Sequence, residues 1–283
     1  MRITINHVKD FKKNGERFAM LTAYDYATAR LVDSAGVPLI LVGDSLGMVV
    51  LGYESTVHVT LDEMLHHTKA VARGARNAMI VGDMPFLSYH LSAEQALANA
   101  GRFLQEANAQ AVKLEGGVNV ADKVARLVGC GIPVMGHIGL TPQSVNQLGG
   151  FKAQGKTAET ARCILEDALA LSEAGAFAVV LEAIPAELAR LITQRIDVPT
   201  IGIGAGPFCD GQVQVISDIL GLSEYTPRHA KIFACLGEYT TRAVQDFAKE
   251  VAAGTFPTEK EGFALDAAVI AELGIHNPTA NQE

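Results

Sequence analysis

The sequence lacks any apolar run approaching the roughly 18 residues that span a membrane, and VPLILV at 37–42 is among its longest. Positive charge is also scarce: 23 Lys and Arg residues face 31 Asp and Glu residues, which gives a formal net charge of −8. Without a basic cluster, the chain offers no counterion release from nucleic-acid phosphates. We therefore expect neither a membrane nor a nucleic acid as its partner.

Cysteine is scarce as well. The four cysteines, at 130, 163, 209 and 235, are too far apart for a zinc knuckle or a CxxC redox pair. The first 18 residues are polar and mixed in charge, and they lack the apolar segment of a secretion signal. We therefore expect a cytoplasmic protein with reduced cysteines.

What the chain has is enough apolar residues for a large core. Hydrophobic residues make up 49% of its 283 residues, which is too many for a disordered chain. α/β barrels of about 250 residues fold as one unit. We expect a single domain over 1–283, with a mobile C-terminal tail from about residue 273.

Short apolar strands alternate with amphipathic helices along the chain. The eight candidate strands are 18–24, 38–44, 78–83, 111–116, 133–139, 177–183, 199–205 and 212–218. The candidate helices are 25–35, 61–75, 92–108, 119–129, 157–174, 185–195 and 229–253. Such alternation implies parallel strands joined by right-handed crossovers, and eight units favour a closed (β/α)₈ TIM barrel of the α/β class.

Local signals support these boundaries. Thr60 and Glu63 form a capping-box pattern before one helix, and Ser92 and Gln95 repeat it before the next. Two connections, 45–60 and 140–157, are longer than chain closure requires. Long polar loops in a compact domain are often lids or binding loops.

The strand at 111–116 carries two charges on the face that would point into the barrel. Side chains alternate between faces, so Lys113 and Glu115 share one face, while Val112 and Leu114 share the apolar face toward the helices. Burying two charges costs several kcal/mol each unless they are paired or bind an ion. A mutual ion pair that fills the barrel end is the simplest structural alternative to a functional site.

Ionisable residues recur at the ends of other strands. Asp44, Asp83, His137 and Glu182 each follow strand residues that alternate in the same phase. The active sites of these barrels lie at the C-terminal mouth and are assembled from different strand ends. Six ionisable residues at one mouth predict an active site, although a lone histidine would more often be a hydrogen-bonded core residue.

Three of these residues are carboxylates, Asp44, Asp83 and Glu115, and they would repel one another without a cation. Hard oxygen ligands suit Mg²⁺, and one ion per subunit would keep open positions for water or substrate oxygens. Such an ion can chelate a 2-oxo acid and act as a Lewis acid when a neighbouring C–H is deprotonated.

The remaining residues of the mouth suit the same chemistry. Lys113 adds positive charge, Ser45 can donate to a substrate carboxylate, and Glu182 can act as a base. A Schiff base at Lys113 is an alternative, but nearby carboxylates favour the charged lysine, which is not nucleophilic. The glycines of IGIGAG at 201–206 lack the helix and the acidic residue of a nucleotide fingerprint, so we expect them to allow close packing.

From about Lys9 to about Pro257, the chain resembles the ketopantoate hydroxymethyltransferase family. The resemblance rests on MLTAYDY (20–26), VGDSLGMVVLGYEST (42–56), HTKAVARGA (67–75), DMPF (83–86), VKLEGG (112–117), GHIGLTPQSVNQLGGFKAQGK (136–156), LEAIP (181–185) and IGIGAG (201–206). His58 departs from the family pattern, which has a proline at that position. No proposed ligand is lost.

The resemblance implies transfer of a one-carbon unit from 5,10-methylenetetrahydrofolate to 3-methyl-2-oxobutanoate, which gives 2-dehydropantoate for pantothenate synthesis. It implies a barrel related to the phosphoenolpyruvate/pyruvate superfamily and a homodecamer. The roles it implies are Mg²⁺ binding by Asp44, Asp83 and Glu115, contact with the oxo acid by Asp44, Ser45, Asp83 and Lys113, proton acceptance by Glu182, and a polar neighbouring position for His137.

Two other functions compete with this one. A Mg²⁺-dependent carbon–carbon lyase of the same superfamily would act on a dicarboxylic acid, but the 140–157 loop lacks the cysteine that such lyases can carry. A barrel that only binds metabolites would lack some of the metal-ligating residues at its mouth, whereas in this sequence each expected position carries such a residue. We therefore expect an enzyme.

Overall fold

The computed structural model describes residues 2–223 and 225–275. By its internal contacts the chain divides into two compact units, Met1–Ala234 and Cys235–Glu283. The expectation of one domain over 1–283 stays a prediction, and most of the expected tail from about residue 273 lies outside the described residues. None of the described helices is both long enough and apolar enough to cross a membrane.

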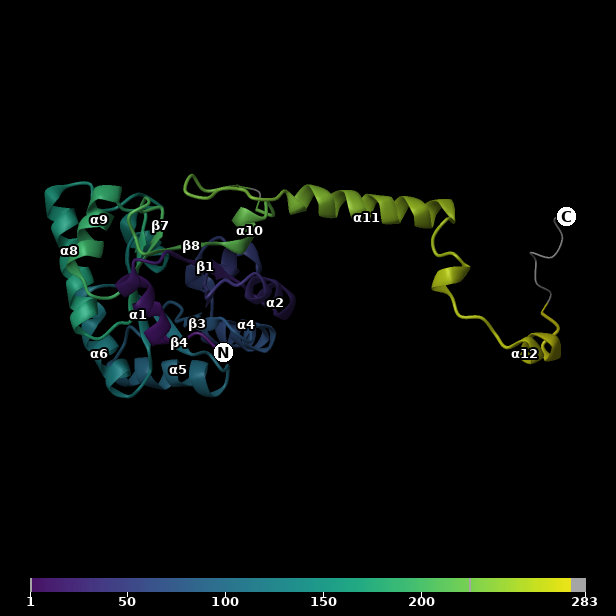
Figure 1. The fold of residues 1–283 in the computed structure, drawn as a ribbon, viewed down its shortest axis with the longest axis horizontal. Coiled ribbons are helices and arrows are strands. Elements are labelled where there is room, and N and C mark those ends of the chain that lie inside the picture. Colours follow the sequence, from purple (N-terminus) through teal and green to yellow (C-terminus); the bar gives the residue numbers. More distant parts are fainter. Residues whose placement is uncertain (1, 224, 276–283) are drawn as a thin grey trace. The chain divides into compact units, whose positions relative to one another are not determined.

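The first unit is built around a closed barrel of eight parallel strands (Figure 1). They are β1 Phe18–Thr22, β2 Leu39–Val42, β3 Met79–Asp83, β4 Ala111–Glu115, β5 Val134–Gly139, β6 Ala178–Glu182, β7 Thr200–Ile203 and β8 Gly211–Gln214. Each strand pairs with the next in sequence, and β8 pairs with β1. This confirms the predicted (β/α)₈ barrel.

Helices alternate with these strands. The longer helices of this unit are α1 Ile5–Asn14, α2 Tyr26–Ser34, α4 Leu61–Gly74, α5 Ala93–Gln105, α6 Ala121–Gly129, α8 Ala158–Glu173 and α9 Ala186–Arg195. The shorter ones are α3 Leu46–Val49, η1 Thr56–His58, η2 Val118–Val120, η3 Pro142–Ser144, α7 Val145–Leu148 and α10 Ile216–Ile219. The two long loops therefore contain short helical turns.

The second unit consists of α11 Leu236–Ala253, η4 Glu259–Glu261 and α12 Ala267–Glu272. The expected helix over 229–253 begins seven residues late, and the prediction was wrong for that stretch. The N–H groups of Phe233 and Ala234 donate to the Ile219 carbonyl of α10, at 2.8 and 3.3 Å, instead of to a carbonyl of a continuing helix. The expected strand over 212–218 likewise ends at Gln214, and α10 follows.

The strand residues alternate between two apolar layers. Met20, Leu39, Met79, Met135 and Val213 point into the barrel, where they form one buried cluster. The alternate residues of the strands pack outward against the helices in a larger cluster. Because the inner layer is apolar along the strands, the ionisable side chains of the barrel interior lie at the carboxyl ends of the strands.

The predicted caps are confirmed in one case and half confirmed in the other. Thr60 accepts a hydrogen bond from the N–H of Glu63, and the Glu63 carboxylate accepts one from the N–H of Thr60. The Ser92 hydroxyl accepts from the N–H of Gln95, but the Gln95 side chain accepts from the N–H of Leu91 instead.

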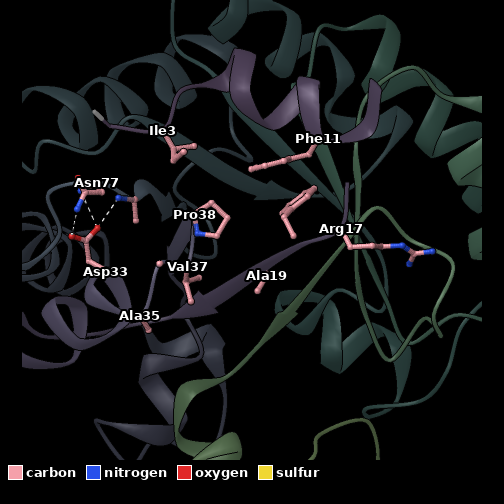
Figure 2. A pocket seen from close by; sticks show the side chains of 12 residues that line it. Ile3, Phe11, Arg17, Ala19, Asp33, Ala35, Val37, Pro38 and Asn77 are labelled. Atoms are coloured by element: carbon pink, nitrogen blue, oxygen red, sulfur yellow. Dashed lines mark hydrogen bonds between the residues drawn. The ribbon is translucent and has the colours of Figure 1, made fainter. Parts of the chain in front are cut away.

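The sequence analysis missed α1, which lies over the amino ends of the strands. Lys12 anchors it by donating to Asp210 at 3.2 Å and to the Thr193 carbonyl at 2.7 Å. Figure 2 shows an open pocket beside this helix, with Phe11 and Arg17 among its lining residues. Its cavity of about 520 Å³ lies at the strand ends opposite the predicted site.

Candidate active site

The six predicted ionisable side chains lie together at the carboxyl ends of the strands. Asp44, Asp83, Lys113, Glu115 and His137 are each at most 4% exposed, and Glu182 is half-buried. In the register of the sheet, Asp83 lies beside Lys113, and Glu115 lies beside His137. Val112 and Leu114 pack in the outer apolar cluster, whereas Lys113 and Glu115 contact side chains of the neighbouring strand ends, which confirms that they point inward.

A continuous run of contacts joins four strand ends. Lys113 Nζ lies 2.7 Å from Asp83 Oδ1 and 3.2 Å from His137 Nδ1. His137 Nδ1 lies 3.4 Å from Glu115 Oε1, and its Nε2 lies 3.0 Å from Glu182 Oε2. Lys113 therefore pairs with Asp83, on the neighbouring strand, and the alternative of a mutual pair with Glu115 is not what the structure shows.

Both cations of this run hold their charge. Burial and the charge of Lys113 lower the pKa of His137, but the carboxylates of Glu115 and Glu182 outweigh them and raise it to about 9. Burial likewise lowers the pKa of Lys113, but Asp83, Glu115 and Asp44 raise it above its ordinary value. At neutral pH His137 is therefore an imidazolium, paired by charge with Glu115 and Glu182.

The carboxylates differ from one another. Burial, followed by the charges of Asp83 and Glu115, raises the pKa of Asp44 well above its ordinary value. Burial also raises the pKa of Asp83, although Lys113 opposes this. Burial acts in the same direction on Glu115, but His137 and Lys113 outweigh it, and the pKa of Glu115 is lowered.

The charges of this cluster do not balance. When ionised, the four carboxylates exceed the two cations by two negative charges, and oxygen donors of this kind suit a hard divalent cation. Within residues 2–223 and 225–275, however, no three His, Cys, Asp or Glu side chains are close enough to hold a metal ion together. The oxygen donors and the excess of negative charge suit Mg²⁺, but the described side chains are not arranged around a common metal position.

Two buried residues that the sequence analysis missed complete the carboxylate cluster. Gln143, from η3, donates from its side chain to Asp44 Oδ2 at 2.9 Å and from its main chain to Glu115 Oε2 at 3.0 Å. Tyr89 donates to the Gln143 amide oxygen at 2.7 Å. Neither residue ends a strand, so the pattern of strand ends could not find them; burial of a loop glutamine is visible only in the structure.

Ser45 is held by a tyrosine from the end of β1. The hydroxyls of Tyr24 and Ser45 lie 2.9 Å apart, and Tyr24 is buried. Burial raises the pKa of Tyr24 to about 12, so its hydroxyl stays protonated. Ser45 is thereby fixed beside Asp44 at the same mouth.

The backbone around Glu182 is unusually constrained. Ala183 has a φ of 48°, in the left-handed region, which costs a non-glycine residue about 1–2 kcal/mol. Gly139, opposite Glu182 in the sheet, has a φ of 92°, and a Cβ there would collide with the Glu182 carbonyl oxygen. Strained backbone tends to cluster at active sites, which supports a functional role for Glu182.

Solved structures of other proteins share this fold. Phosphonopyruvate hydrolase, in a complex with oxalate and Mg²⁺, matches with a TM-score of 0.59 at 13% identity, over 96% of this chain and 95% of that chain. 2,3-Dimethylmalate lyase, a member of the PEP mutase/isocitrate lyase superfamily, matches with a TM-score of 0.57 at 16% identity, over 97% and 99%. These likenesses show the fold: the chain is a (β/α)₈ barrel, as these proteins are.

Sequence comparison gives the family. The family described as ketopantoate hydroxymethyltransferase matches residues 2–259. A 3-methyl-2-oxobutanoate hydroxymethyltransferase of Dehalococcoides mccartyi is 65% identical over 274 residues, which cover 96% of this chain and 98% of that protein. One of Chloroflexus aggregans is 60% identical over 267 residues, covering 94% and 95%. The chain belongs to the ketopantoate hydroxymethyltransferase family, as its sequence motifs predict.

Proposed function

We propose that this enzyme transfers a one-carbon unit from 5,10-methylenetetrahydrofolate to 3-methyl-2-oxobutanoate, giving 2-dehydropantoate for pantothenate synthesis. In the balanced reaction, C3 of the oxo acid loses a proton and gains the carbon, water supplies the oxygen of the hydroxymethyl group, and tetrahydrofolate is the second product. The observation that carries the proposal is the buried run from Asp83 through Lys113 and His137 to Glu182, in a chain of this family.

Glu182 is the proposed proton acceptor. Its Oε2 lies 3.0 Å from His137 Nε2, a charge contact that would hold the carboxylate in place and leave Oε1 for the proton at C3. Glu182 is also the most accessible acid of the cluster, with a side chain 16% exposed. Glu182 is therefore the acid of the cluster that a substrate could reach most readily.

Lys113, Ser45, Asp44 and Asp83 are the proposed contacts of the oxo acid. The Lys113 ammonium has donors left beyond Asp83 and can stabilise negative charge as it develops on the substrate oxygens. Ser45, oriented by Tyr24, can donate to the substrate carboxylate. These groups would fix the C3–H bond relative to Glu182.

Mg²⁺ is the proposed cofactor, held by Asp44, Asp83 and Glu115. When bound, it would polarise the keto group of the oxo acid as a Lewis acid. Support comes from the excess of two negative charges in the cluster and from the raised pKa of Asp44, which reflects burial beside two other carboxylates.

We further propose a homo-oligomer, a decamer by family resemblance, that works in the cytoplasm. No side chain of α11, all of whose residues are described, is buried, although Leu236, Tyr239, Val244 and Phe247 are apolar. An amphipathic helix of this kind gains stability from a partner surface. The four free cysteines are consistent with a reducing compartment.

The direct test is a product assay with Mg²⁺, the oxo acid and methylenetetrahydrofolate. The proposal predicts folate-dependent formation of 2-dehydropantoate, and absence of that product would reject it. The alternative lyase activity would instead release pyruvate or glyoxylate from a dicarboxylic acid. Its support is the shared fold alone.

A further inference from the structure

Gln143 is a loop glutamine that is almost completely buried. It lies in η3, within the long loop 140–157, and is 3% exposed. A buried amide must find partners for its oxygen and its nitrogen, and Gln143 does so. Its Nε2 donates to Asp44 Oδ2 at 2.9 Å and to the Met84 carbonyl at 3.0 Å, and its Oε1 accepts from Tyr89 at 2.7 Å.

The surroundings of this amide fix which way it points. The Met84 carbonyl can only accept, so the NH₂ group must face it and Asp44. The Tyr89 hydroxyl accepts from the N–H of Glu115 at 3.1 Å, and of its two possible acceptors the Gln143 amide oxygen, at 2.7 Å, is nearer than the Glu115 carbonyl, at 3.2 Å. Tyr89, which is 0% exposed, thus locks Gln143 with its donors toward the carboxylate.

Gln143 also reaches a second carboxylate through its main chain. Its N–H donates to Glu115 Oε2 at 3.0 Å. One residue therefore occupies Oδ2 of Asp44 and Oε2 of Glu115, at the ends of two different strands. The other oxygen of each carboxylate remains for a further partner, although Glu115 Oε1 also lies 3.4 Å from His137 Nδ1.

We propose that Gln143, oriented by Tyr89, is a positioning residue for the divalent cation site. It holds one oxygen of Asp44 and one of Glu115 with neutral donors and leaves Oδ1 and Oε1 to bind the cation. Because Gln143 belongs to the 140–157 loop, the site is complete only when this loop is in place. The inference rests on the proposed function, which assigns these carboxylates to Mg²⁺.

The test is equilibrium binding of Mn²⁺, measured by the electron paramagnetic resonance of the free ion, without substrates. Mn²⁺ takes the same oxygen ligands as Mg²⁺. Gln143→Met keeps the length of the side chain and removes its donors, and we expect Mn²⁺ affinity to fall about 10- to 100-fold, the usual effect of losing a group that orients metal ligands. Tyr89→Phe should also lower the Mn²⁺ affinity, but by a smaller factor than Gln143→Met.

The control is Gln147→Met in the same loop, where the glutamine is exposed. It should bind Mn²⁺ like the wild type. Thermal unfolding without metal separates positioning from folding, because the positioning role predicts that Mn²⁺ raises the melting temperature of Gln143→Met less than that of the wild type.

The outcomes separate this inference from the proposed function. Wild-type Mn²⁺ affinity in a folded Gln143→Met variant would overturn the positioning role and leave the proposed reaction intact. If that variant does not fold, undiminished affinity in Tyr89→Phe overturns the role equally. A wild type that binds no Mn²⁺ rejects the proposed cation site, and the inference fails with it.

Discussion

At the residue scale, Lys113 holds the site together. Its side chain is 4% exposed, and its ammonium lies 2.7 Å from Asp83 and 3.2 Å from His137. A buried carboxylate that loses its only cationic partner keeps the cost of desolvation without the attraction that offsets it. Lys113 should therefore matter for stability as well as for substrate binding.

We predict that Lys113→Met lowers the free energy of unfolding by about 3–5 kcal/mol, because it leaves Asp83 buried and unpaired. Urea unfolding measures this. Lys69→Met is the matched control, since the pair of Lys69 with Glu106 is exposed and screened by solvent, and it should change stability little. If Lys113→Met changed the free energy of unfolding as little as Lys69→Met does, Lys113 would not be neutralising a buried charge.

The sequence could predict which residues meet at the mouth but not how they pair. Strand periodicity brings Lys113 and Glu115 to the inner face, whereas the pairing of Lys113 with Asp83 depends on the stagger between neighbouring strands. Gln143 carries no charge, and its partners are 28 to 99 residues away in sequence. No local pattern encodes such contacts.

At the element scale, Asp33 joins the end of α2 to the start of β3. Its carboxylate accepts from the N–H groups of Arg76, Asn77 and Ala78 at 3.1, 2.9 and 2.7 Å. Partial burial raises the pKa of Asp33, but these hydrogen bonds outweigh it, and the pKa lies below its ordinary value. The ionised carboxylate therefore stabilises the fold.

A depressed pKa gives a definite pH dependence. The contribution of Asp33 is fully present above its unfolded pKa of about 3.9 and is lost as the pH falls through the lower folded value. We predict that Asp33→Asn is less stable than the wild type at pH 6 and that the difference shrinks by pH 3. Urea unfolding at both pH values measures it, and a difference independent of pH would contradict the account.

Most elements were predictable because their signals are local. All eight strands were predicted, since short apolar runs that are bounded by turns and alternate with helices are typical of the strands of such a barrel. The helix α1 was not predicted because Val8 is its only buried residue and only Ile5, Val8 and Phe11 of its ten residues are apolar. Two kinds of long-range contact hold α1: the packing of Val8 and Phe11 against the inner apolar cluster, and the contact of Lys12 with Asp210.

At the scale of the whole molecule, the barrel unit carries the site, and the second unit carries apolar side chains that its own contacts do not bury. Phe247 is 57% exposed and contacts only the edge of Phe256 among the described aromatic rings. Such side chains are expected where copies of a chain associate. The family resemblance gives the same expectation.

We predict that Phe247→Glu lowers the molar mass of the assembly in solution, because it puts a charge on this apolar face. Light scattering coupled to size-exclusion chromatography measures the mass. Gln245→Glu, at an exposed position of the same helix, adds the same charge and should leave the mass unchanged. A wild type of 30.0 kDa in solution would reject the oligomer.

The proposed reaction begins with removal of the proton from C3 of the oxo acid by Glu182. The most direct test is deuterium exchange at C3 of 3-methyl-2-oxobutanoate in D₂O with Mg²⁺ and without folate. The wild type should catalyse exchange, and Glu182→Gln should still bind the oxo acid while exchange slows by about 10²- to 10⁴-fold. Exchange at the wild-type rate in Glu182→Gln would contradict the account.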